Sequence, residues 1–185
     1  MLTPTEEVAV LFSSAEIQQC IRELAQAIRQ DYSGKDLLVI CILKGAFIFM
    51  ADLIRAIDLP LEIDFMSVSS YGAATVSTGE VRIMKDLDRS IQDRHVLIVE
   101  DMVDSGLTLH YIMEILQKRQ PASIKVCTLL NKPSRRTTPV KVDYVGFDID
   151  NVFIVGYGLD YAEQYRGLPY IGILNPHVYE SREKE

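Results

Sequence analysis

Three acidic residues and three small residues lie within nine positions of one another near the middle of the chain. They are Glu100, Asp101, Asp104, Ser105, Gly106 and Thr108. Adjacent carboxylates accept hydrogen bonds from vicinal hydroxyl groups, or approach a metal ion bound to those hydroxyls. Backbone N–H groups of a small-residue turn and of the helix after it hold a phosphate dianion. The run therefore predicts a binding site for a phosphorylated sugar.

The flanking residues predict the elements that position this run. Residues 96–99 form an apolar stretch typical of a buried strand, and apolar residues recur at helical spacing after the turn. Those residues are Leu109, Ile112, Met113 and Leu116. The alternative is an ordinary strand-to-helix turn in which Asp104 or Ser105 caps the helix. Three acids within five residues exceed what capping requires, so we favour the binding site.

Residues 96–109 resemble the phosphoribosyl pyrophosphate signature of the type I phosphoribosyltransferases, and the three acids resemble the hypoxanthine-guanine branch of that family. The resemblance implies that Glu100 and Asp101 bind the ribose hydroxyls, directly or with Mg²⁺. The turn that wraps the 5′-phosphate in this family corresponds here to Asp104, Ser105, Gly106, Leu107 and Thr108.

Asp104 is an unusual neighbour for a phosphate, because like charges repel. We expect its carboxylate to face N7 of a purine and to take its proton as N9 attacks the anomeric carbon. Leu107 stands where some family members carry lysine, which leaves the phosphate to backbone amides and hydroxyl groups.

Two further motifs resemble the loops that meet pyrophosphate in this family. The sequence LKGA contains Lys44 and Gly45, which the family often joins to the preceding strand through a cis peptide. Glycine there lets the backbone approach the ligand closely. The sequence SSYG contains Ser70 and Tyr71, which resemble the start of a mobile loop that covers the site and excludes water.

The stretch from residue 130 to residue 167 resembles the family's base-binding region. By this resemblance the ammonium group of Lys132 reads the 6-oxo group of a purine, and a cation there disfavours an amino group at the same position. Phe153 stacks on the base and Ile154 offers backbone groups to its edge. Asp160 holds Mg²⁺ through water, and Arg166 contacts pyrophosphate.

Some of these residues have ordinary structural roles as alternatives. Lys44 taken alone is better explained as a solvated lysine in a turn. Phe153 taken alone is better explained as a core aromatic in a strand. For Arg166 the alternative is a surface ion pair with Asp160 or Glu163, which contributes little stability. The binding hypothesis depends on the four motifs occurring together.

The pattern of apolar runs predicts an α/β fold. We expect one domain over residues 1–185, with a mostly parallel twisted sheet flanked by helices, a small hood region and a mobile loop. A capping box at Ser13 and Glu16 opens a helix that ends near residue 33. Further helices are expected over residues 45–56 and after residue 106. Strands are expected over residues 37–43, 61–69, 81–87, 95–100, 123–130, 142–147 and 153–156.

Composition limits the possible functions. A net charge of −7 argues against general nucleic-acid binding, which needs a basic surface. The spacing of Cys20, Cys41 and Cys127 suits no metal site. The chain has neither a signal-like N-terminal segment nor an apolar run that spans a bilayer, so we expect a reducing, cytoplasmic setting and no membrane partner.

The resemblance implies Mg²⁺-dependent transfer of a 5-phosphoribosyl group from phosphoribosyl pyrophosphate to N9 of hypoxanthine or guanine, with release of pyrophosphate. It also implies a homodimer or homotetramer, for which the apolar helix over residues 46–57 offers a surface. The order of preference among the 6-oxopurines stays open.

Three other protein classes share parts of these patterns. A nucleotide-sensing regulator on the phosphoribosyltransferase fold keeps the phosphate turn, but usually adds a basic face or a winged helix. A receiver domain has an acidic strand, although near its N-terminus. P-loop proteins carry the pattern GxxxxGK[ST], which does not occur in the sequence.

Overall fold

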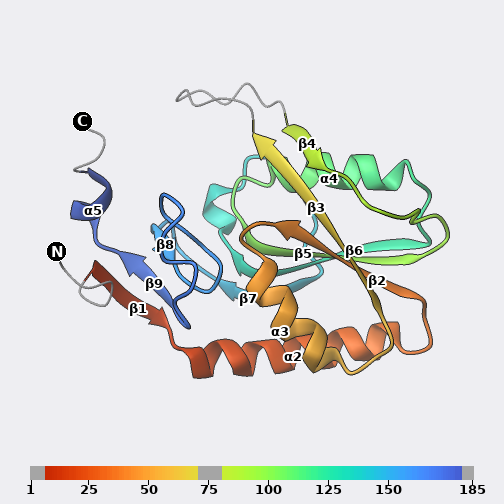
Figure 1. Ribbon diagram of the computed structural model, residues 1–185, viewed down its shortest axis with the longest axis horizontal. Coiled ribbons are helices and arrows are strands. Elements are labelled where there is room, and N and C mark those ends of the chain that lie inside the picture. Colours follow the sequence, from red (N-terminus) through yellow and green to blue (C-terminus); the bar gives the residue numbers. More distant parts are fainter. Residues whose placement is uncertain (1–6, 71–80, 181–185) are drawn as a thin grey trace.

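A six-stranded sheet forms the centre of the computed structural model, which describes residues 7–70 and 81–180. In spatial order its strands are β4 (Val81–Lys85), β3 (Glu62–Ser70), β2 (Leu37–Leu43), β5 (His95–Val103), β6 (Ser123–Asn131) and β7 (Tyr144–Asp148). All neighbouring strands pair in parallel except β3 and β4, which are antiparallel. This mostly parallel sheet confirms the predicted fold class (Figure 1).

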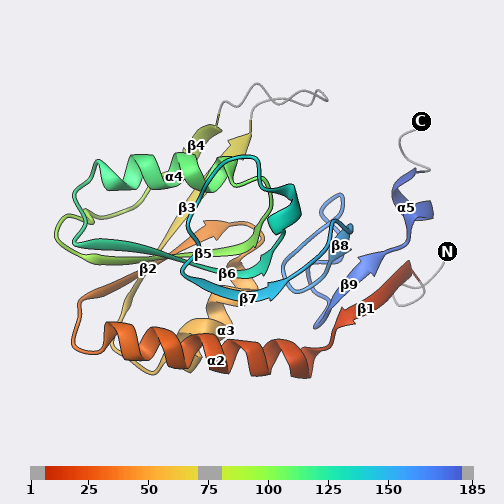
Figure 2. The same cartoon turned by 180° about the vertical axis from the view of Figure 1, so that it is seen from behind.

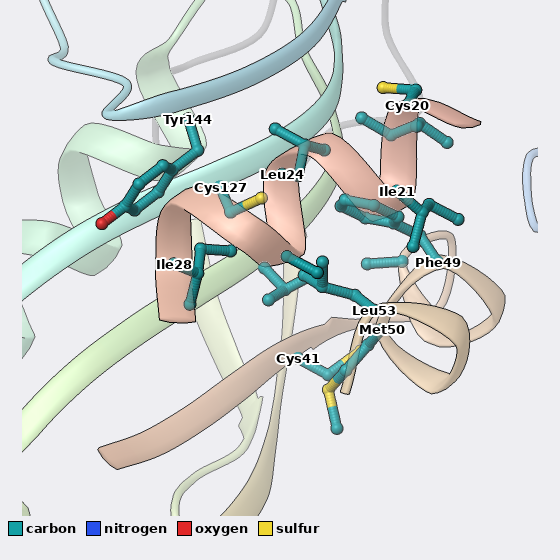
Figure 3. Packing of buried hydrophobic residues seen from close by; sticks show 14 of the residues in the cluster. Cys20, Ile21, Leu24, Ile28, Cys41, Phe49, Met50, Leu53, Cys127 and Tyr144 are labelled. Carbon is teal, nitrogen blue, oxygen red and sulfur yellow. The ribbon is translucent and has the colours of Figure 1, made fainter. Parts of the chain in front are cut away.

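Helices cover both faces of the sheet. α2 (Ser14–Tyr32) and α3 (Phe47–Ile57) lie on one face and α4 (Leu107–Gln117) lies on the other, as the two opposite views show (Figures 1 and 2). Side chains of the central strands therefore alternate between two cores. Leu97 and Val99 of β5 join the cluster with α2 and α3, whereas Val96 and Ile98 join the cluster with α4. Figure 3 shows part of the first cluster, with Ile21, Leu24 and Ile28 of α2 beside Phe49 and Leu53 of α3.

The first long helix begins as the sequence predicts. The Ser13 side chain accepts a hydrogen bond from the Glu16 N–H, and the Glu16 carboxylate accepts one from the Ser13 N–H at 2.8 Å. Seven side chains of α2 are buried, among them Ile17, Ile21 and Ile28. The predicted capping box and apolar face are both confirmed.

A second, three-stranded sheet lies beyond the carboxyl ends of the main sheet (Figure 1). It contains β1 (Val8–Phe12), β9 (Ile171–Leu174) and β8 (Ile154–Val155), all antiparallel. We call these strands and residues 156–170 the hood. β1 and β9 pair from Val8 with Leu174 onward, so the two ends of the described chain lie side by side. The short helix α5 (Pro176–Glu180) follows β9.

Several predicted boundaries were wrong. β5 continues through both acids to Val103 instead of ending at Glu100, because its backbone stays paired with β6 up to Asn131. The strand predicted over residues 153–156 is shorter and belongs to the hood instead of the main sheet. The helix predicted to start at Gly45 begins at Phe47.

The mobile loop expected around Tyr71 lies outside the described residues. Within the described part of the chain, no helix is both long enough and apolar enough to cross a membrane.

Candidate active site

A cleft of about 800 Å³ opens between the carboxyl ends of the main strands and the hood. It is lined by residues from both sides, and nine of the predicted site residues are among them. Those nine are Lys44, Gly45, Asp101, Asp104, Lys132, Phe153, Ile154, Asp160 and Arg166. Ligands of open α/β sheets bind at this edge, because the strand ends and the loops after them meet there.

The two adjacent acids of β5 face opposite sides of the strand. Asp101 lines the large cleft, whereas Glu100 lines a smaller cavity of about 110 Å³ near the start of α4. This separation follows from the alternation of side chains along a strand. Burial, and then the charge of Asp101, raise the pKa of Glu100 well above its usual range. Burial also raises the pKa of Asp101 to about 6.

The smaller cavity lies at the N-terminus of α4. It is lined by residues that include Ser105, Gly106 and Thr108. Gly106 is the N-cap at φ +85°, and no side chain caps the helix. A Cβ atom at this position would collide with the Thr138 carbonyl oxygen. Glycine is therefore required both by the positive φ and by the lack of space for a side chain. Apart from the Leu107 N–H, which donates to Ser105 Oγ, the N–H groups of the first turn of α4 therefore remain available to an anion.

Asp104 lies where the two cavities meet and pairs with a cation. Its Oδ1 lies 3.2 Å from Nε of Arg135, and its backbone carbonyl accepts a hydrogen bond from Arg136. Buried Lys132 lies in the same cleft and donates from Nζ to the carbonyl oxygen of Val152 at 2.8 Å. Burial lowers the pKa of Lys132, while the nearby charge of Asp104 opposes that shift.

Gly45 packs directly against the Asp101 carboxylate of β5. The peptide between Leu43 and Lys44 is cis, as the family resemblance implied. A Cβ atom on Gly45 would overlap the Asp101 carboxylate, and a Cβ atom on Gly158 would overlap the Gly45 carbonyl oxygen. The backbone at Gly45 is thus held between the main sheet and the hood without room for a side chain.

The hood presents a network of charged side chains to the cleft. Arg166 Nη2 lies 2.9 Å from Oδ1 of Asp160 and 3.3 Å from Oε2 of Glu163, while Nη1 donates to the Gly158 carbonyl. Glu163 Oε1 lies 3.0 Å from Nζ of Lys44. Lys44 and, less strongly, Arg166 lower the pKa of Glu163.

An aromatic group completes the hood side. The Phe153 ring is 42% exposed, and it contacts Tyr161 edge-on at 5.6 Å and Tyr179 of α5 at 5.1 Å between ring centroids. Its exposure contradicts the alternative of a core aromatic. Ile154, the next residue, is buried in β8.

The family model described as "Phosphoribosyl transferase domain" matches residues 10–162. The chain belongs to the phosphoribosyl transferase family. The hypoxanthine-guanine phosphoribosyltransferase of Bacillus subtilis is 56% identical over 172 residues, which cover 93% of this chain and 96% of that protein. The protein of the same name from Mycobacterium avium is 55% identical over 97% of this chain and 91% of its own length.

A solved structure of a phosphoribosyl transferase superposes closely on this chain. The crystal structure of a hypoxanthine phosphoribosyltransferase from Staphylococcus aureus matches with a TM-score of 0.92 and 50% identity, covering 95% of this chain and 96% of that one. The agreement extends beyond the fold, since half of the aligned residues are the same.

Three predicted residues are not among the described residues that line either cavity. Tyr71 lies outside the described residues, and only the backbone of Ser70, at the end of β3, is described. Leu107 begins α4, and its side chain lines neither cavity, while its N–H donates to Ser105 Oγ at 3.4 Å.

Sequence reasoning missed some residues that reach the site. Arg135 and Tyr179 line the large cleft, and Arg136 holds the turn before α4 through the Asp104 carbonyl. Glu163 entered only as an alternative partner of Arg166, and its contact with Lys44 was not foreseen. The adjacent arginines after Lys132 were the available signal, because paired cations near a phosphate turn favour anion binding.

The predicted metal ligands do not form a single cluster. Within residues 7–70 and 81–180, no group of three or more His, Cys, Asp or Glu side chains is placed to hold a metal ion. Glu100 faces the other cavity, and Asp160 is engaged by Arg166 and by the Glu163 N–H at 2.8 Å.

Asp101 nevertheless fits Mg²⁺, which is usually held by one or two carboxylates together with substrate oxygens and water. A buried carboxylate whose pKa is raised is stabilised in its charged form by a nearby cation.

Proposed function

We propose that this protein is a purine-salvage enzyme that transfers the 5-phosphoribosyl group of phosphoribosyl pyrophosphate to N9 of hypoxanthine, and of guanine, giving IMP or GMP and pyrophosphate. One observation carries the proposal. A single cleft contains a cation suited to a 6-oxo group, a carboxylate suited to a purine nitrogen and two cations suited to pyrophosphate, and it adjoins a cavity at a helix N-terminus.

The smaller cavity suits the 5′-phosphate. N–H groups in the first turn of α4 and the hydroxyl groups of Ser105 and Thr108 supply hydrogen-bond donors, and the helix dipole favours an anion. Glu100 in that cavity and Asp101 in the cleft lie on either side of β5, and we assign them to the ribose hydroxyls. Lys44, Gly45 and Arg166 are assigned to pyrophosphate.

The base fits between the end of β6 and the hood. We assign the buried ammonium of Lys132 to the 6-oxo group, because a cation on a carbonyl oxygen disfavours the 6-amino group of adenine. The exposed ring of Phe153 offers a stacking face, and the backbone at Ile154 offers groups to the base edge.

Asp104 is assigned as the general base. As N9 forms its bond to the anomeric carbon and the bond from that carbon to pyrophosphate breaks, the purine loses a proton, which the carboxylate accepts from N7. Its ion pair with Arg135 holds the carboxylate at the junction of the two cavities. The remaining side chains bind, orient and exclude water, so positioning and electrostatics provide the rest of the rate.

Mg²⁺ belongs to the proposal as the cofactor. Asp101 and, through water, Asp160 would hold it near the ribose hydroxyls and pyrophosphate. When bound, it would neutralise charge on the departing pyrophosphate. The relatives described above are named as enzymes, and nothing in the comparisons supports the alternative of a nucleotide-sensing regulator.

Cytoplasmic location and assembly into a homodimer or homotetramer are further parts of the proposal. All three cysteines are free and buried, which suits a reducing compartment. Phe47 at the start of α3 is 43% exposed and offers apolar surface to another copy.

A direct assay tests the activity. The protein is mixed with Mg²⁺, phosphoribosyl pyrophosphate and one nucleobase at a time, and pyrophosphate release is followed. We expect turnover with hypoxanthine and guanine, and little with adenine. Omission of Mg²⁺ is the control. Absence of turnover with every 6-oxopurine would overturn the proposal.

A further inference from the structure

One carboxylate of the hood lies between the two cations assigned to pyrophosphate. Glu163 places Oε1 3.0 Å from Nζ of Lys44 and Oε2 3.3 Å from Nη2 of Arg166. Each of its two oxygens thus contacts a different cation, and Lys44 and Arg166 lie 119 and 3 residues from Glu163 in the sequence. The arrangement resembles the contacts that an anionic ligand would make across the cleft.

The backbone holds this carboxylate in an uncommon conformation. Tyr161 and Gln164 exchange backbone hydrogen bonds of 3.2 and 3.0 Å, and the two residues between them, Ala162 and Glu163, have φ values of +51° and +62°. Such a tight turn favours Asn or Gly at both central positions, because other residues are strained there. The Glu163 N–H also donates to Asp160. A strained glutamate directed at two cations suggests a function beyond forming the turn.

Orienting Arg166 does not account for Glu163. Arg166 is already held by the Asp160 carboxylate at 2.9 Å and by the Gly158 carbonyl at 2.8 Å. Glu163 is also the residue that reaches across the cleft to Lys44. Its side chain and that of Lys44 are each 66% exposed, so the pair is solvated and exchanges readily with another anion.

We propose that the Glu163 carboxylate is an internal stand-in for pyrophosphate, which occupies Lys44 and Arg166 in the ligand-free enzyme and is displaced when pyrophosphate or the pyrophosphate group of the substrate binds. This inference rests on the proposed function. Glu163 keeps two neighbouring cations from repelling each other while the cleft is empty. The cost is competition with the ligand, which weakens pyrophosphate binding and so favours product release.

The size of the competition follows from the contacts. Pyrophosphate must replace two ion pairs of the 66% exposed Glu163 side chain, one with the equally exposed Lys44 and one with Arg166, whose side chain is 20% exposed. Ion pairs with an exposed partner are of modest strength. Removing the carboxylate charge should therefore tighten binding of inorganic pyrophosphate by about three- to tenfold. The KM for phosphoribosyl pyrophosphate should also fall, because this substrate carries the same pyrophosphate group. The KM for hypoxanthine should stay unchanged.

The test compares Glu163→Gln with the matched control Asp58→Asn. Asp58 is also an exposed acid at positive φ (+53°) that pairs with an arginine, Arg29 at 3.0 Å, but it does not line the cleft. The Kd of inorganic pyrophosphate is measured by calorimetry with excess Mg²⁺ at fixed ionic strength. The KM values for both substrates are measured beside it.

Tighter pyrophosphate binding in Glu163→Gln alone, with an unchanged KM for hypoxanthine, supports the inference. Unchanged or weaker binding, or equal tightening in Asp58→Asn, overturns it. Glu163→Asn, an amide that the turn tolerates well, repeats the measurement if the glutamine variant is unstable. The binding measurement needs no turnover. Absence of turnover in the unmodified protein would contradict the proposed function. Normal turnover in the unmodified protein, with the same pyrophosphate affinity in Glu163→Gln, would contradict this inference alone.

Discussion

The carboxylates on the two sides of the cleft differ in their ion pairing. On the hood, Asp160 and Glu163 both form ion pairs with Arg166. At the end of β5, Glu100 and Asp101 form no ion pair within residues 7–70 and 81–180, and burial raises the pKa of both. The β5 side therefore carries acids that a bound cation would stabilise, whereas the hood is already balanced and must exchange its partners for those of a ligand.

This difference indicates a division of work between the two sides. Buried Glu100 and half-buried Asp101 lie on a central strand that pairs with β2 up to Val99 and with β6 beyond the acids, and so they supply fixed positions for hydroxyls and metal. On the hood, the Glu163 side chain is 66% exposed, so its ion pairs break and form at small cost, whereas the Asp160–Arg166 pair is more buried. Asp104 combines features of both sides, because it directly follows β5 but forms an ion pair, with Arg135, as the hood acids do. Variants of Asp104 therefore test the comparison between the two sides.

The largest effect is expected for Asp104→Asn. If the carboxylate accepts the purine proton, the amide cannot replace it, and kcat should fall by about 10²-fold or more. The control is Arg135→Gln, which breaks the same ion pair but keeps the carboxylate and should retain most of kcat. Steady-state kinetics with hypoxanthine measures both. A near-normal kcat in Asp104→Asn would rule out the general-base role and leave Asp104 as an ion-pair partner only.

A second large effect is expected for Lys132→Ala. Loss of the ammonium group should reduce the preference for hypoxanthine over adenine, as a ratio of kcat/KM values, by roughly 10²-fold. Lys132→Met keeps the apolar stem and should show the same loss. Lys125→Ala, at the opposite end of β6, should not, because Lys125 pairs with Asp31 away from the cleft. An unchanged preference in both Lys132 variants would show that the β6 side does not read the base.

The smallest effect is on stability and compares one acid from each side. The folded-state pKa of Asp101 is about 6, against an ordinary value of 3.8. Because the folded protein holds this proton more tightly than the unfolded chain, the free energy of unfolding should fall as pH rises from about 4 to about 6. The loss should be at most about 3 kcal/mol.

Asp101→Asn should remove that part of the pH dependence and be more stable than the unmodified protein at pH 7 without ligands. Asp160→Asn loses its ion pair with Arg166 and should gain no stability. Urea unfolding at several pH values measures both. If Asp160→Asn gains as much stability as Asp101→Asn, the comparison between the two sides is wrong.

The central sheet could be predicted because its signals are local. Apolar runs such as β2, the capping box at Ser13 and the helical spacing after Gly106 each lie within one element. A small hood region was expected from the family resemblance, but its strands and their pairing could not be predicted from local patterns, because β8 has two residues, β9 has four, and both depend on pairing that includes β1 at the far end of the chain. Short strands carry too few residues for a periodic pattern.

The site was predictable by residue type more than by geometry. The motifs identified nine of the cleft residues, including Lys132 and Phe153. They did not show that Glu100 and Asp101 face opposite cavities, because the strand was predicted to end at Glu100. Nor did they show that Glu163 reaches Lys44, since that contact depends on a tight turn whose positive φ values Ala and Glu do not favour.

The pairing of Val8 with Leu174 has a consequence for how the protein is made. During translation β1 emerges from the ribosome before the strands of the main sheet, but its partner β9 emerges after all of them. Closing a loop of nearly the whole chain carries a large entropic cost, so we expect the sheet to fold before the hood. Until then the growing chain lacks the wall that carries Phe153. A nascent chain therefore acquires its phosphate cavity and Lys132 before the stacking face of Phe153 is in place, and any ribosome stall before β9 leaves β1 as an unpaired edge open to aggregation.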